Sequence, residues 1–211
     1  MLTRTQFTLL LGLLWGPFIL GGLATLAGPA GPVPTLNDAH CLALLGQELL
    51  QLAIGCGFLL LVGWPLPPLQ LNITVRQSLG GLLLFGLAYL LTLLGQQLAV
   101  ALGADASALT TLLAQINVSW PVATLVSLVN GSFEELVLVW LIFARLGHHG
   151  TGFAVGISVL LRVLAHVYQG PVGVTGVFIF ALLMALAYAR YRRIWPLILA
   201  HALTDLLALL Q

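Results

Sequence analysis

The chain has 211 residues, of which 60% are hydrophobic and only 6% are charged, and its formal net charge at pH 7 is +1. Its mean hydropathy is +1.10. A water-soluble domain of this size carries far more charge, so the composition excludes that class and indicates an integral membrane protein. The positive charges are arginines spread along the chain, which excludes the dense basic surface that a nucleic-acid partner requires.

The apolar stretches are long enough for membrane-spanning helices and lack the alternating pattern of a membrane barrel. We therefore predict an all-α fold, a polytopic transmembrane helical bundle that forms a single domain over residues 1–211. Glycine, proline and polar clusters separate the spans. About seven spans are predicted, at residues 6–27, 41–64, 79–102, 118–146, 152–168, 172–189 and 194–210.

The first three spans carry little chemistry. We interpret the first as an uncleaved helix, because it is longer than the apolar region of a secretory signal and more spans follow. Cys41 and Cys56 lie in the second span, about 22 Å apart along a helix, which is too far for a disulfide. Glu48 in the same span either contacts another helix or extends its carboxylate toward the membrane surface.

Residues 109–146 allow two interpretations. Two short helices broken near Asn130-Gly131 would give eight spans, whereas one long helix from Trp120-Pro121 gives seven. Short cytoplasmic loops collect positive charge. The single helix places these arginines on one side: Arg4, Arg76, Arg145 and the RYRR cluster at 190–193. We prefer the single helix with a kink at Asn130-Gly131, and a cytoplasmic N-terminus in a prokaryotic cytoplasmic membrane.

Two adjacent carboxylates, Glu134 and Glu135, fall inside this long apolar helix. Counted from Arg145 they lie about 15 Å from the cytoplasmic boundary, near the bilayer centre. Ionised carboxylates at that depth are costly, and their usual explanation is functional. Neighbouring positions point about 100° apart on a helix, so we expect the two glutamates to have different roles.

The remaining polar groups at membrane depth lie in two later spans. His166 follows Arg162 by one helical turn in LLRVLAHVYQGP, and counted along the helix it lies about 5 Å deeper than Glu134. His201 and Asp205 share one face of the last span. Each group alone is compatible with helix packing or a structural ion pair. Together they favour one polar site built from three helices.

Carboxylates and histidines around a hydrated pocket suit water activation and proton transfer. The sequence has no serine in a nucleophile elbow and no H-E-x-x-H motif. A divalent metal such as zinc, held by Glu134, His166 and His201, stays open. His148 and His149 lie in the loop RLGHHGTG, where we expect them to be solvated and without a role.

The order EE, then HVYQGPVG, then H-x-x-x-D resembles the CPBP family, the CAAX proteases and bacteriocin-processing intramembrane endopeptidases that include the Ras-converting prenyl protease. The resemblance covers residues 118–210. It implies that Glu134 activates water with Glu135 as its structural companion, and that His166 assists. It further implies that His201 and Asp205 stabilise the oxyanion, and that the substrate is a peptide or a membrane-tethered protein segment in the lipid bilayer.

Two positions depart from the family pattern. Val139 stands where the first motif has arginine, and Arg162 stands where the second has an aromatic residue. We hypothesise that Arg162 supplies the missing guanidinium from the next helix and pairs with Glu134 or Glu135. The alternatives are a non-catalytic membrane partner of the bacteriocin-immunity or scaffold type, and a proton-coupled transporter that uses Glu134 and His166.

Overall fold

The structure, a computed structural model, describes residues 2–27, 35–65 and 68–210. Helices form nearly all of its regular structure, which confirms the all-α prediction. The main helices are α1 Arg4–Ala27, α2 Asp38–Leu61, α3 Val75–Ala101, α4 Ser107–Ala114, α5 Trp120–Glu134, α6 Ile142–Leu146, α7 Thr151–Ala165, α8 Gly170–Tyr191 and α9 Trp195–Leu209. Shorter helical turns are η1 Glu135–Leu141, η2 Gly147–His149 and η3 Val167–Gln169.

Each predicted span corresponds to a helix whose ends agree to within four residues. Five helices are long and apolar enough to cross a membrane, and two more, α7 and α9, are apolar but shorter. A full crossing takes about 20 residues, so the two short helices do not span the hydrocarbon core if they stand upright. The chain is an integral membrane protein.

Helix starts follow from local chemistry. The side chains of Asn37 and Thr74 accept hydrogen bonds from the backbone N–H groups of His40 and Gln77, which caps α2 and α3. Prolines stand in the first turn of α5, α8 and α9. The missing N–H of proline costs nothing there, because first-turn N–H groups have no helical partner.

The ambiguous region resolves into a separate short helix, α4, and one continuous helical run from Trp120 to Leu146. The single long helix is therefore confirmed. At Asn130-Gly131, where the sequence predicted a kink, α5 remains α-helical. The irregular segment is the π-helix η1, which begins about one turn later.

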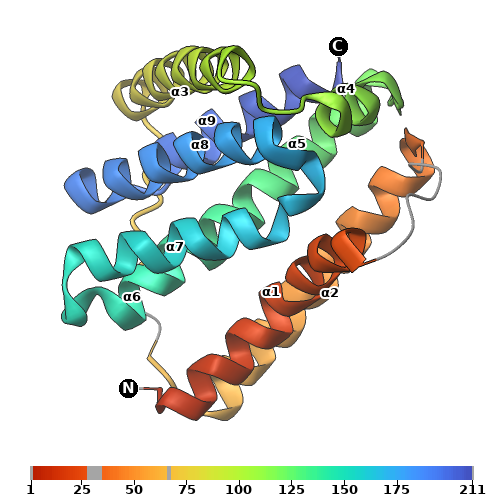
Figure 1. The fold of residues 1–211 in the computed structure, drawn as a ribbon. Coiled ribbons are helices and arrows are strands. Elements are labelled where there is room, and N and C mark those ends of the chain that lie inside the picture. The colour runs from red at the N-terminus through yellow and green to blue at the C-terminus, as the bar shows by residue number, and fades with distance from the viewer. Residues whose placement is uncertain (1, 28–34, 66–67, 211) are drawn as a thin grey trace.

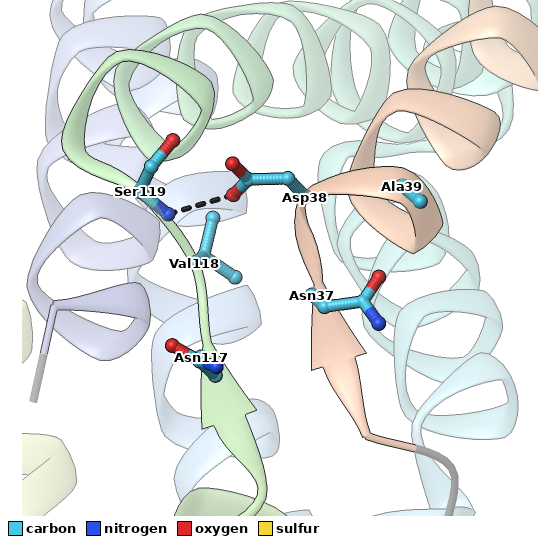
Figure 2. Close-up of a pocket in the computed structure, with 6 residues that line it drawn as sticks. All are labelled: Asn37, Asp38, Ala39, Asn117, Val118 and Ser119. Carbon is cyan, nitrogen blue, oxygen red and sulfur yellow. Dashed lines mark hydrogen bonds between the residues drawn. The ribbon is translucent and has the colours of Figure 1, made fainter.

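A pair of two-residue strands, β1 Leu36–Asn37 and β2 Ile116–Asn117, brings the start of α2 beside the start of α5. Next to it, the backbone N–H of Ser119 donates to Asp38 Oδ1 at 2.7 Å (Figure 2). These contacts outline a cavity of about 400 Å³ and fix α2 against α5.

The run from α5 to α6 is the centre of the bundle. In its most apolar 18-residue stretch 61% is buried, whereas the corresponding share for α3 is 11%. Helices α2 and α9 pack on α5, and α1 packs on α7. Figure 1 shows α1 and α2 paired at one edge, with α3 at the opposite edge beside α8 and α9. The long helix therefore presents its side chains to neighbours on several sides.

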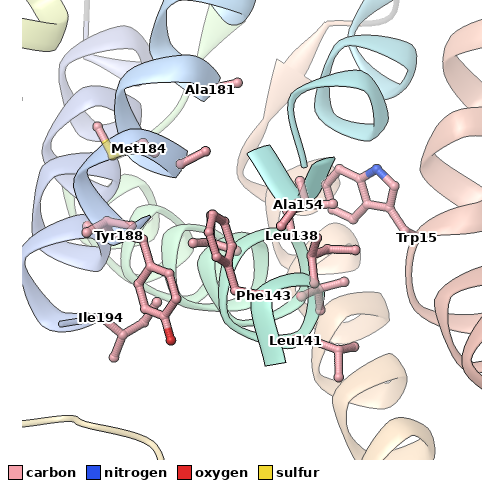
Figure 3. Close-up of a cluster of buried hydrophobic side chains, with 14 of the residues drawn as sticks. Trp15, Leu138, Leu141, Phe143, Ala154, Ala181, Met184, Tyr188 and Ile194 are labelled. Carbon is pink, nitrogen blue, oxygen red and sulfur yellow. The ribbon is translucent and has the colours of Figure 1, made fainter. Parts of the chain in front are cut away.

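Part of the apolar core lies around η1 and α6 (Figure 3). Leu138 and Ile142 are fully buried there, and Met184 and Ala185 of α8 face them. Trp15 of α1 joins this core, and its indole N–H donates to the Leu161 carbonyl at 2.9 Å. That hydrogen bond ties α1 to α7 close to Arg162.

Candidate functional site

Glu134 is the last residue of α5, and Glu135 is the first residue of the π-helix η1. Both lie about midway along the run from Trp120 to Leu146, and their exposed fractions are 5% and 0%. A π-helix widens the turn and redirects side chains, and such turns occur often at functional sites. The two carboxylates therefore enter the protein interior where the backbone changes geometry.

The guanidinium of Arg162, itself 2% exposed, lies against both glutamates. Its Nε is 3.2 Å from Glu134 Oε2, and its Nη2 donates to Glu135 Oε1 at 2.7 Å. The pairing that the sequence predicted for Arg162 is present. The ring of Phe180 lies 5.5 Å from the guanidinium carbon on another side and adds a cation–π contact.

The two glutamates are held differently. Glu135 Oε1 accepts from Arg162 and also lies 2.7 Å from His201 Nδ1, so its position is fixed by two short contacts. Glu134 Oε2 pairs with Arg162 without an aligned hydrogen bond, and Glu134 Oε1 has its nearest charged neighbour, His166, at 4.0 Å. Glu134 thus keeps lone pairs that no described group occupies, which a proton acceptor requires.

His166 follows the last residue of α7 and faces Glu134. Its Nδ1 lies 2.8 Å from the Arg162 carbonyl oxygen. A carbonyl oxygen can only accept, so Nδ1 carries the proton, and in the neutral ring Nε2 is an acceptor. Nε2 lies 4.0 Å from Glu134 Oε1, so the depth difference expected from residue counting does not separate the two groups.

The last helix supplies the other side of the cluster. His201 is 5% exposed, and its Nε2 lies 3.6 Å from Asp205 Oδ1. The Asn130 amide donates to Asp205 Oδ2 at 2.7 Å. All the predicted site residues, Glu134, Glu135, Arg162, His166, His201 and Asp205, therefore belong to one connected network.

The network is partly exposed on one side. The side chains of His166 and Asp205 are 20% and 24% exposed, compared with 7% for Glu134. The ring of Tyr168 stacks on that of His166 with 5.9 Å between centroids, and it is itself exposed. The open side therefore lies at the ends of α7 and α9.

The sequence analysis missed Asn130 and Phe180. Asn130 precedes Glu134 by four residues and so shares its helical face, a signal that was present in the sequence. Phe180 contacts both Arg162 and the edge of the His201 ring, at 5.0 Å between centroids. Nothing along the chain distinguishes it from other apolar residues of α8.

Glu48 of α2 is 3% exposed, and within the described residues its Oε2 has no hydrogen-bond partner. The carboxylate therefore does not extend to the membrane surface. It faces neighbouring helices, as one of the two interpretations required, and α2 packs directly on α5. The site thus has a further buried carboxylate close to its edge. Cys41 and Cys56 are both free thiols, as predicted.

The predicted zinc ligands do not fit a metal in this arrangement. Arg162 occupies the side of Glu134 with its own positive charge, and Glu135 engages His201 Nδ1. Across the part of the chain that the structure describes, no three His, Cys, Asp or Glu side chains are placed to hold one ion.

Comparison with known proteins gives one match. Residues 115–207 match the family model described as type II CAAX prenyl endopeptidase Rce1-like. Neither the curated proteins nor the solved structures give a significant match. The matched region begins before α5 and ends within α9, so it includes every residue of the network described above, while Glu48 of α2 lies outside it. Residues 115–207, somewhat less than half of the chain, are therefore similar to the type II CAAX prenyl endopeptidases of the Rce1-like family.

Proposed function

We propose that this protein is an intramembrane endopeptidase in which Glu134 and His166 activate a water molecule. The observation that supports it most directly is the pair of unshared acceptors, Glu134 Oε1 and His166 Nε2, which lie 4.0 Å apart. One water can bridge two polar atoms at this separation. Such a water donates one hydrogen to each acceptor, which leaves its oxygen lone pairs free to attack a carbonyl.

The reaction then needs only proton transfers within the network. The water oxygen bonds to the carbonyl carbon of the scissile peptide as Glu134 takes its proton. The same proton passes to the amide nitrogen, the C–N bond breaks, and an amine and a carboxylic acid are released. Arg162 balances the charge of Glu134 before the transfer, and its contact at 3.2 Å is long enough to relax afterwards.

His201 is the proposed oxyanion donor. Its Nδ1 is engaged by Glu135 at 2.7 Å, whereas its Nε2 lies 3.6 Å from Asp205 Oδ1, beyond hydrogen-bond distance, and is the nitrogen left to donate to an oxyanion. Donors fixed before reaction stabilise a developing negative charge without reorganisation. Asn130 holds Asp205 in place, and Asp205 orients His201.

The function is tested by cleavage of membrane-anchored fluorogenic peptides, with and without a prenylated cysteine, by the purified protein in liposomes. We expect cleavage by the wild type and a loss of about 100-fold or more with His166→Ala, the size of a general acid–base contribution. No cleavage of any substrate by a folded wild type would favour the non-catalytic partner. Proton-coupled uptake that depends on Glu134 would favour the transporter.

Gly131→Ala tests the approach of α9 to α5. A methyl group at Gly131 would lie 3.0 Å from the Ala202 backbone nitrogen and 3.3 Å from His201 Cβ. Helix α9 must shift by a few tenths of an ångström, and with it His201, so we expect about a tenfold loss of turnover. Gly86→Ala in α3, with open space around it, is the matched control and should keep full activity. Equal effects of the two variants would contradict this prediction.

A further inference from the structure

A second cavity lies at the end of the bundle that carries the N-terminus. Its volume is about 580 Å³. It is lined by two arginines from helices far apart in the chain, Arg4 of α1 and Arg145 of α6, and by His149. Its apolar wall includes Phe7, which is buried, and Phe153, which is 50% exposed. The cavity is thus both cationic and partly apolar.

No side-chain carboxylate balances this charge. All six acidic residues are accounted for in the described structure, and none pairs with Arg4 or Arg145. Four lie in or beside the site within the bundle, and two, Asp38 and Asp105, lie at the opposite end.

Arg145 is incompletely satisfied. Its Nε is buried and has no hydrogen-bond partner among the described residues, and its guanidinium carbon lies 5.8 Å from the Phe7 ring centroid. Arg145 and Arg4 both line the cavity, so an anion there would meet two guanidinium groups. The planar fork of arginine matches the oxygens of a phosphate group.

We propose that this cavity binds a phosphate-type anion through the guanidinium groups of Arg4 and Arg145. The chemistry is shared by a free phosphate and by the headgroup of an anionic phospholipid. The cavity lies at the ends of membrane helices, beside an exposed phenylalanine that can contact an acyl chain. Basic pockets between helices at a membrane surface have this form when they take lipid headgroups.

The test measures anion binding by the purified full-length protein in neutral detergent. Native mass spectrometry counts the phosphatidylglycerol retained, with phosphatidylcholine as the uncharged reference. Thermal melting in inorganic phosphate, compared with chloride at equal ionic strength, measures the free anion. The variant is Arg4→Gln with Arg145→Gln. Its matched control is Arg76→Gln with Arg190→Gln, which removes the same charge from the same end of the bundle.

We expect the cavity variant to bind phosphatidylglycerol about 30-fold more weakly, since each arginine contributes roughly fivefold, and the control to lose less than about fivefold. Retention of phosphatidylglycerol without a response to phosphate identifies a lipid site, and a response to both identifies a site for the anion itself. Equal losses in variant and control, or no preference over phosphatidylcholine, overturn the proposal. If the double variant melts early without anion, Arg4→Gln alone should still show about a fivefold loss.

Discussion

Glu134→Gln is expected to lower turnover by at least about 100-fold while the protein melts within a few degrees of the wild type. The amide cannot accept a proton from water, so the base contribution is lost. The fold is little affected, because the contacts of Glu134 with Arg162 at 3.2 Å and with His166 at 4.0 Å include no aligned hydrogen bond. Steady-state cleavage in liposomes and thermal melting in detergent measure the two effects separately.

Glu135→Gln is the matched comparison, one residue away and with the same chemical change. Glu135 is fully buried, and its Oε1 receives both Arg162 and His201 at 2.7 Å. Removing one partner of a buried ionic network costs roughly 3–5 kcal/mol, so this variant should unfold at a clearly lower temperature. If Glu134→Gln were the unstable variant and Glu135→Gln the stable one, the assignment of base and structural companion would be reversed.

Arg162→Phe is expected to lose both stability and activity. The substitution leaves Glu134 and Glu135 without their shared cation in the interior, at a cost of roughly 3–5 kcal/mol. Arg162 is 2% exposed, so water cannot replace the guanidinium without entering the bundle. Thermal melting and peptide cleavage should fall together, in contrast to the split expected for Glu134→Gln.

Val139→Arg added to Arg162→Phe restores the family pattern and should recover most of both losses. Val139 is fully buried in η1, four residues after Glu135, so an arginine there has no route to solvent and can satisfy its charge only at the glutamates. The two substitutions should therefore show a large favourable coupling in a double-mutant cycle. A double variant less stable than Arg162→Phe alone would contradict the exchange, as would a harmless single substitution.

The sequence by itself determined the fold class and the positions of the helices, and it predicted which polar residues lie together. Hydropathy and the scarcity of charge are summed along the chain, so they located each helix to within four residues. The high cost of a polar group in lipid marked the few such residues as partners. The pairing of Arg162 was predicted from the family resemblance, whose first motif has an arginine where this chain has Val139.

Only the tertiary structure decided which atoms meet. It distinguished Glu135, held by two short contacts, from Glu134, which faces His166, and it joined Asn130 to Asp205. It also placed the irregular turn at η1 and brought Arg4 beside the cavity of Arg145. Hydropathy and helical periodicity describe one helix at a time, whereas distances between side chains depend on how helices pack, rotate and tilt against one another.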